Sequence, residues 1–218
     1  MKSWGGRFLA ELTPGVRVVL SLLVAVWLMA VLGQALAGIH LDHWLALSGP
    51  WFWHGEVWRL VTYVLLPTGF MDLLMNGLAV VLLGRMLDRH WSRGEFWIYC
   101  LVTVAGAGLA KVGLQCSNPQ PLTGAGPMAF GLLIGWGFLG GREAITVVFL
   151  GETTVWKLVL LTGAVSLLVL GFTAGLVPAL IMAAGGLAGF TYLWLKHQWL
   201  MSRAGSVVQS ERIRRLEL

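Results

Sequence analysis

The sequence predicts an all-α polytopic membrane protein, a six-transmembrane-helix bundle, and three observations support this fold class. First, 57% of the 218 residues are hydrophobic and only 11% are charged, whereas a soluble domain carries roughly a quarter charged residues. Second, six apolar stretches approach the about 20 residues that cross a hydrocarbon core as a helix. Third, runs such as 78–83 are apolar on every side, unlike the alternating strands of a barrel. These observations exclude a water-soluble globule.

Six helices are expected in chain order, because lipid offers unpaired backbone groups no partners. The first apolar stretch is too long for the core of a signal peptide, so we expect a retained helix there. The connections are short, so we expect the whole chain, 1–218, to form a single membrane domain with cytoplasmic segments at 1–15 and 198–218. The expected spans cover residues 16–38, 69–87, 95–114, 127–140, 155–171 and 176–195.

The basic residues predict how these spans are oriented. With the N-terminus in the cytoplasm, 13 of the 15 Lys and Arg residues fall on the inner side, and only Arg59 and Lys111 fall outside. The positive-inside rule gives this asymmetry for six crossings with both ends in the cytoplasm. Topology and anionic lipid therefore explain the net charge of +5, and no nucleic-acid partner is expected.

Two connecting segments are long enough for structure of their own. The outer loop, 39–57, carries three tryptophans, whose indole rings favour headgroup depth. We expect a short helix near 43–47 to lie flat in the interface. An aromatic belt and a gate both remain open as roles for this loop. The stretch 145–150 is apolar but too short to cross, and is expected to be an interfacial loop.

Asp72 is the clearest ionisable residue within an expected span, and such a residue is by default a functional-site hypothesis. Asn76 follows at i+4, so both polar side chains share one helix face. The alternative is a wetted, structural carboxylate near the outer end of its helix.

Small residues mark two further features. The segment 123–131 is a glycine-rich loop that runs into a short apolar helix, with Pro127 suited to the first helical turn. The last span contains Gly185 and Gly189, a small-xxx-small spacing that lets another helix approach closely.

Taken in order, these features resemble the rhomboid superfamily of intramembrane serine proteases and their inactive relatives, over roughly residues 16–197. The pair Trp58 and Arg59 is similar to the family's Trp-Arg pair in the first loop. Asp72 and Asn76 stand where the family has His-x-x-x-Asn, so the asparagine is kept and the histidine is not. The resemblance implies the six-helix rhomboid fold.

The catalytic positions of the family are replaced in this chain. Gly124 and the aromatic Phe130 resemble the family's Gly-x-Ser-Gly loop and its following aromatic, which puts Gly126 in the serine position. The family's catalytic histidine, three residues before the first glycine of the last-helix Gly-xxx-Gly, falls on Met182, or on Ala183 with a shift of one residue. The resemblance therefore implies that both members of the catalytic dyad are missing.

A rhomboid needs a serine hydroxyl activated by a histidine, and donors that stabilise the oxyanion. With Gly126, Met182 and Asp72 as degenerate positions, we expect no catalytic residue, and we expect a pseudoprotease that binds transmembrane segments of client proteins without cleaving them. Arg59 is expected to bind carbonyls of the first loop. Asn76 and Gly124 are the expected oxyanion-like or cavity residues, and the expected structural or client-recognition residues are Trp58, Arg59, Phe130, Gly185 and Gly189.

Three alternatives remain. One is a rhomboid serine-type peptidase with non-standard residues, for which Thr123 is the candidate nucleophile. Another is a small membrane transporter or scaffold that uses Asp72 as a polar path. A third is a structural protein of one fixed complex. No metal or cofactor is expected, and the expected partners are client transmembrane helices and the lipid bilayer. The compact form resembles bacterial members, which implies the inner membrane.

Overall fold

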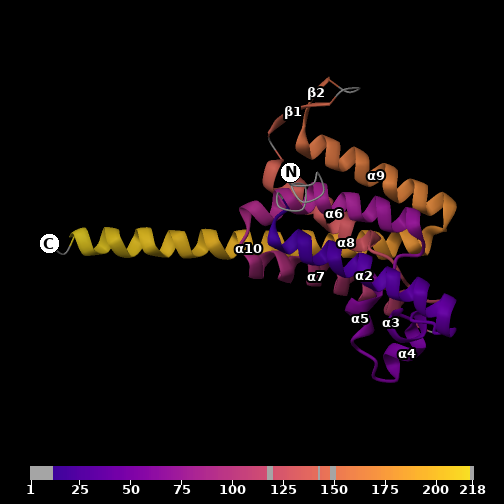
Figure 1. Ribbon diagram of the computed structural model, residues 1–218. Coiled ribbons are helices and arrows are strands. Elements are labelled where there is room, and N and C mark those ends of the chain that lie inside the picture. The colour runs from indigo at the N-terminus through magenta and orange to yellow at the C-terminus, as the bar shows by residue number, and fades with distance from the viewer. Residues whose placement is uncertain (1–11, 117–119, 142, 148–150, 217–218) are drawn as a thin grey trace, which may run out of the picture.

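The computed structural model describes residues 12–116, 120–141, 143–147 and 151–216, and these form a helical bundle (Figure 1). Five described helices are long and apolar enough to cross a membrane. They are α2 (Pro14–Ala37), α6 (Phe70–His90), α7 (Arg93–Leu114), α9 (Val155–Thr173) and α10 (Leu176–Leu216). The all-α polytopic class is therefore confirmed.

The remaining apolar helix, α8 (Gly126–Gly140), is shorter than the other five. Its 15 residues extend about 22 Å at 1.5 Å per residue, less than the about 30 Å of a hydrocarbon core. A sixth full crossing therefore stays a prediction. Pro127 lies in the first turn of this helix, where its missing N–H costs no hydrogen bond.

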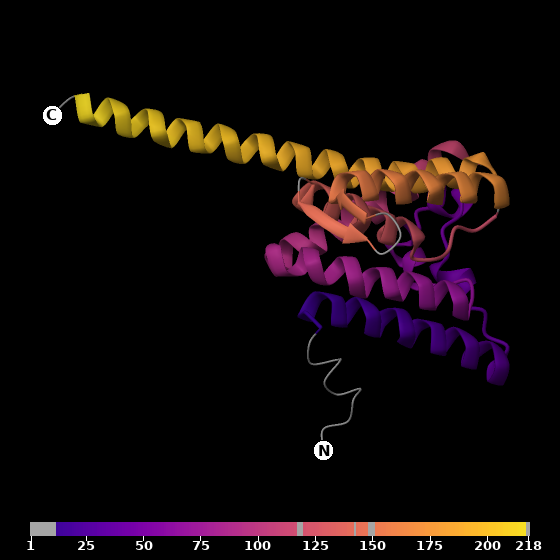
Figure 2. The same ribbon diagram turned by 90° about the horizontal axis from the view of Figure 1, so that it is seen from above.

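One predicted helix end is wrong. The last helix was expected to end near 195, but α10 stays helical to Leu216 and leaves the bundle as a long projection (Figure 2). Hydropathy marks only the apolar part of a helix, whereas helix formation needs only residues whose backbone tolerates the helical conformation. From 196 to 216 the sequence has no proline and a single glycine, Gly205, so nothing local breaks the helix.

The outer loop folds into short helices at the end of the bundle opposite this projection (Figure 1). They are α3 (Asp42–Leu45), α4 (Gly49–Trp53) and α5 (Arg59–Thr62), followed by the 3-10 turn η1 (Tyr63–Leu65). The short helix expected near 43–47 is thus present as α3. Leu47 pairs with Leu122 through backbone N–H to carbonyl bonds of 3.1 and 2.7 Å. This bridge ties the loop to the segment that precedes α8.

A second correction concerns 145–150, which was expected to be an interfacial loop but begins within a strand. Strands β1 (Ala144–Val147) and β2 (Gly151–Thr154) form an antiparallel pair, while 148–150 lie outside the described residues. Ile145 lies opposite Thr153 in this register. Adjacent β-branched residues favour extended pairing, a local preference that apolarity alone does not reveal.

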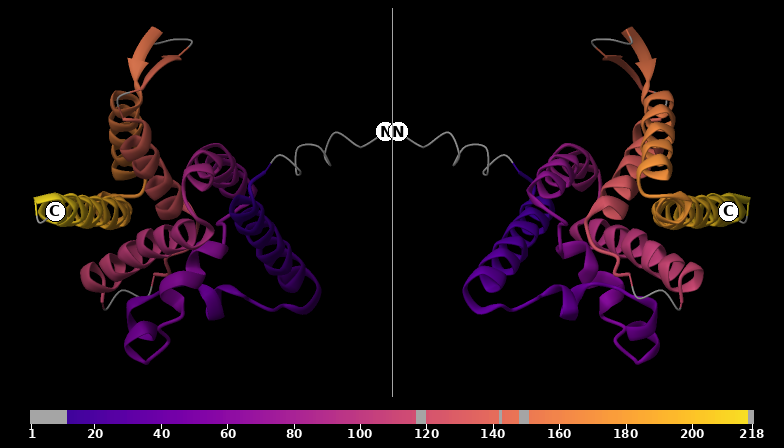
Figure 3. Two further views of the ribbon diagram at one scale, coloured as in Figure 1. Left: turned by 90° about the vertical axis from the view of Figure 1, so that its left-hand side faces the viewer. Right: turned by 90° about the vertical axis from the view of Figure 1, so that its right-hand side faces the viewer.

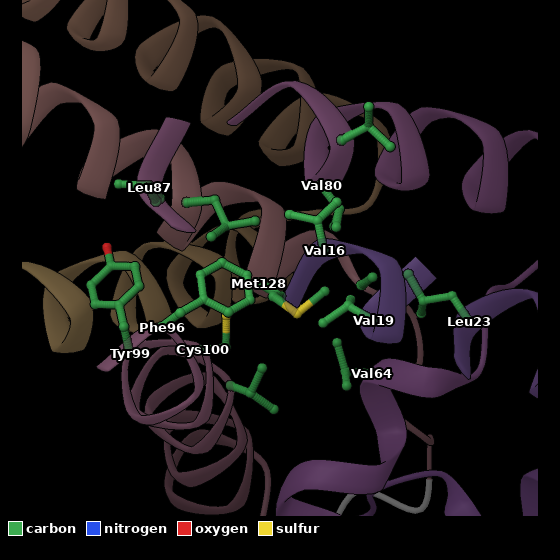
Figure 4. Close-up of a cluster of buried hydrophobic side chains, with 14 of the residues drawn as sticks. Val16, Val19, Leu23, Val64, Val80, Leu87, Phe96, Tyr99, Cys100 and Met128 are labelled. Atoms are coloured by element: carbon green, nitrogen blue, oxygen red, sulfur yellow. The ribbon is translucent and has the colours of Figure 1, made fainter. Parts of the chain in front are cut away.

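Helix α8 occupies the middle of the bundle, because it packs against α6, α7, α9 and α10. Seen along α10, helix α2 lies on the far side of α6 (Figure 3). The main core joins α2, η1, α6, α7 and α8 (Figure 4). Its buried side chains include Val16, Val19, Leu23, Val64, Val80, Leu87, Phe96, Tyr99, Cys100 and Met128. This core fixes the N-terminal start of α8 against the N-terminal start of α6.

Candidate functional site

The start of α8 is the centre of the candidate site. Gly126 is the first residue of the helix, and no atom lies within 4 Å of the place that its Cβ would take. Two residues earlier, Gly124 has φ of 99°, a left-handed conformation that favours glycine. Its N–H donates to the Tyr63 carbonyl at 3.1 Å, which anchors the loop to η1. A side chain at position 126 would therefore enter open space beside a fixed loop.

Asp72 lies in the first turn of α6, directly beside this loop. Its Oδ2 accepts the Thr68 N–H at 2.9 Å, and its Oδ1 accepts from Asn76 Nδ2 at 2.5 Å. A Cβ at Gly124 would be 3.1 Å from Asp72 Oδ2. The shared helix face predicted for Asp72 and Asn76 is thus present. The positive end of the helix dipole stabilises a carboxylate in this turn.

The chemistry of this carboxylate differs from that of an oxyanion hole. An oxyanion is stabilised by preorganised donors aimed at the developing charge. The ionised Asp72 is an acceptor only, and it also occupies one donor of Asn76. The carboxylate therefore presents acceptors rather than donors beside Gly124.

Met182 lies on α10, one turn before Gly185. Its side chain packs against an apolar cluster that contains Phe130 of α8 and Val159 of α9. A Cβ at Gly185 would be 3.6 Å from the Pro127 Cβ, so α10 passes the start of α8 at this level. The structure thus places the apolar thioether of Met182 in this cluster, close to the start of α8.

The close helix approach expected at Gly185 and Gly189 is present between α10 and α7. A Cβ at Gly185 would lie 2.9 Å from the Thr103 carbonyl oxygen. A Cβ at Gly189 would lie 2.6 Å from Thr103 Cγ2 and 2.8 Å from Tyr99 Oη. Any larger residue would force the helices apart. These glycines set the position of α10 against α7, and α10 in turn lies beside α8.

Two polar residues at this contact were not found from the sequence. Thr103 is 1% exposed and donates to the Cys100 carbonyl at 2.8 Å. Tyr99 donates its hydroxyl to the Gly131 carbonyl at 2.6 Å, which joins α7 to α8. The small residues predicted a close helix contact, but no spacing in the sequence predicts which helix packs against them.

Arg59 organises the outer loop rather than the start of α8. It is 2% exposed and donates to the Ala46 carbonyl at 2.7 Å and to the His43 carbonyl at 2.5 Å, as the expected carbonyl binding requires. Its Nε also donates to the carboxylate of Glu56, a contact that was not predicted from the sequence. The i, i+3 spacing of Glu56 and Arg59 is the signal that was available.

Aromatic rings complete this loop cluster. The guanidinium carbon of Arg59 lies 4.0 Å from the Trp51 ring centroid, a cation–π contact. Trp58 is 51% exposed, and its indole N–H donates to the Trp44 carbonyl at 3.4 Å. Burial raises the pKa of the neighbouring Tyr63, so its hydroxyl stays a neutral donor to the Val104 carbonyl at 2.9 Å. Trp58 and Arg59 thus donate to backbone carbonyls of the outer loop, whereas Asp72 accepts from Thr68 and Asn76.

A cavity of about 370 Å³ opens between the end of α2 and the segments that precede α6 and α8. Thr68, Thr123 and His40 line it together. The Nδ1 of His40 is 3.8 Å from Asp42 Oδ1. The shared cavity of His40 and Thr123 is a finding of the tertiary structure. Within the described residues no hydrogen bond joins these two side chains.

A model of the rhomboid domain matches residues 54–199, from just before α5 into α10. The chain belongs to the rhomboid family. A curated relative from Bacillus subtilis (strain 168), named "Putative rhomboid protease YdcA", is 34% identical over 82 residues. This match covers 36% of the chain and 39% of the relative's length. With its apolar helices, this rhomboid-family chain is an integral membrane protein.

Proposed function

We propose that this rhomboid-family protein is a pseudoprotease that binds transmembrane segments of client proteins without cleaving them. The observation that carries the proposal is Gly126 at the start of α8, at the position that the sequence resemblance aligns with the rhomboid nucleophile. Glycine has no side-chain atom that attacks a carbonyl, and nucleophilic catalysis needs one. A Cβ at this position would meet no neighbouring atom within 4 Å, so steric conflict does not explain why serine is absent.

The surroundings support the same proposal. Met182 carries no group that removes a proton, and its apolar contacts suit packing. The Asp72 carboxylate opposes the negative charge that develops in acyl transfer. Nucleophile, base and the histidine donor of the oxyanion hole are therefore replaced, only Asn76 is kept, and the remaining structure is a rhomboid scaffold without the dyad.

Client binding is supported by the lipid-facing surface next to the site. Met71 and Met75 are 66% and 61% exposed and flank Asp72 at the outer end of α6. Flexible methionine side chains suit surfaces that accept varied apolar partners. We further propose the bacterial inner membrane, with both termini cytoplasmic, from the excess of basic residues at the inner ends of the helices.

The test compares the parent protein with the Gly126→Ser, Met182→His double variant in liposomes. Each receives a rhomboid-type transmembrane substrate and a fluorophosphonate probe that labels activated serines. Gly113→Ser with Met182→His is the matched control, because Gly113 also has open space but lies on α7. We expect the parent to retain the substrate on co-purification with neither labelling nor cleavage. Of the two double variants, only the one with Gly126→Ser should become labelled, and adding Asp72→His should increase its labelling because it removes the opposing carboxylate.

Two results would contradict the proposal in different ways. Cleavage or labelling of the parent would show that another residue supplies a nucleophile. Loss of the substrate on co-purification, with the protein folded, would remove the client-binding function while leaving the chain inactive.

A threonine-type peptidase is the second candidate, because Thr123 and His40 line one cavity and Asp42 lies beside His40. A hydroxyl, an imidazole and a carboxylate are the groups of a hydrolytic triad. This candidate requires that parent cleavage disappear in both Thr123→Val and His40→Gln. It is excluded when the parent shows no cleavage.

A further inference from the structure

The 370 Å³ cavity at the outer face combines apolar walls with hydrogen-bond acceptors. Ala30, Ile39 and Leu66 contribute apolar surface, while Asp42 and Thr123 contribute oxygen atoms. A cavity of this kind fits a side chain with an apolar stem and a polar end. Lysine and arginine have this construction, and they extend their charged ends toward the membrane surface.

Asp72 adds a negative charge directly behind this cavity. Thr68 lines the cavity and donates its N–H to Asp72 Oδ2, and Gly124, next to the lining residue Thr123, lies against the same oxygen. A carboxylate has about four acceptor positions. Two are used here, by Thr68 and by Asn76. Asp72 therefore retains acceptor capacity one hydrogen bond away from Thr68, a residue that lines the cavity.

No cation of the described chain neutralises this carboxylate. The ion pairs among the described residues join His40 to Asp42, Arg59 to Glu56, and Lys196 to Glu95. No described residue that lines the cavity is lysine or arginine, and its only histidine, His40, already faces Asp42. Arg59 and Lys111, the basic residues of the outer side, donate to the outer loop and to Gln115 instead. The negative charge of Asp72 is thus available to a partner.

We propose that this cavity takes a lysine or arginine side chain from the outer end of a client's transmembrane segment, with Asp72 as the residue that selects the positive charge. This inference rests on the proposed client-binding function and names the chemistry that the site recognises. The stem of the client side chain lies along the apolar wall, and its charged end reaches the acceptors.

The experiment uses the full-length protein in nanodiscs and synthetic transmembrane peptides of leucine and alanine. One peptide carries lysine at its outer end, and a second carries acetyl-lysine, which keeps the stem and removes the charge. Dissociation constants are measured by energy transfer from protein tryptophans to a dansyl group on the peptide. We expect the lysine peptide to bind about tenfold more tightly than the acetyl-lysine peptide.

Variants then assign the preference to Asp72. Asp72→Asn keeps an acceptor for the Thr68 N–H but removes its charge, so most of the tenfold preference should be lost, while Asp42, which faces His40, remains in the cavity. Asp88→Asn is the matched control, since Asp88 lies on the same helix near its inner end and accepts the Gly15 N–H at 3.0 Å. This control should keep the tenfold preference. If the Asp72→Asn variant binds the acetyl-lysine peptide as tightly as the parent does, the variant is folded.

A salt titration of the parent tests the same proposal without any variant. Raising the ionic strength from 0.1 to 1 M shortens the Debye length from about 10 to about 3 Å, which should reduce the lysine preference and leave the acetyl-lysine peptide unaffected. Equal binding of both peptides to the parent would overturn the inference and leave the proposed function intact. Failure of both peptides to bind would instead overturn the proposed function.

Discussion

Replacing Arg59 with alanine should destabilise the outer loop more than any other single charge removal on this face. The guanidinium is 2% exposed, and the Ala46 carbonyl that it binds belongs to a residue that is 3% exposed. A buried polar group that loses its partner costs about 1–3 kcal/mol. The cation–π contact with Trp51 adds about 1 kcal/mol or more. The His43 carbonyl and the Glu56 carboxylate are reached by water and add less.

The sum is about 3 kcal/mol of unfolding free energy for Arg59→Ala. For a chain of this size each kcal/mol lowers the melting temperature by about 2–4 °C, so we expect a decrease of about 6–12 °C. Thermal unfolding in detergent micelles, followed by tryptophan fluorescence, measures it, because three of the 12 tryptophans lie within 39–57.

Arg89→Ala is the matched control, because Arg89 is exposed near the end of α6 and should change the melting temperature little. A melting temperature for Arg59→Ala within about 2 °C of the parent would refute the reasoning. It would mean that water satisfies the Ala46 carbonyl once the guanidinium is removed.

Two further predictions concern the helix contacts. Gly189→Ala should destabilise the bundle by about 1–3 kcal/mol, because its Cβ would overlap Thr103. Gly113→Ala is the control, because its Cβ would enter open space and should not destabilise the bundle. Equal decreases in the two melting temperatures would contradict this prediction. Glu95→Lys should lower stability by about 1 kcal/mol through loss of its ion pair with Lys196, and the added Lys196→Glu should restore it. A double-mutant cycle measures the coupling, and a value near zero would show that the pair contributes nothing.

The sequence predicted the helices well where composition alone decides them. The starts of α2, α8 and α9 fall within two residues of the expected positions, because proline and the onset of apolar residues mark them locally. The pairing of Asp72 with Asn76 followed from helix periodicity in the same way. Each of these features depends on neighbours within one or two turns.

The wrong expectations concern segments where two tendencies compete. The end of α10 was placed by hydropathy, although backbone propensity carries the helix further. The pairing of Ile145 with Thr153 needed knowledge of a partner strand. The position of His40 on the cavity of Thr123 depends on how the outer loop folds over the bundle.

The sequence by itself determined that this chain is a helical membrane protein, because apolar length and residue identity are local properties. Only the tertiary structure decided that Asp72 lies against Gly124 and behind a cavity with no lysine or arginine among its described lining residues. That arrangement depends on the ends of three helices meeting, and their meeting is set by packing of glycines and core side chains across the bundle. No spacing along one helix encodes such a contact.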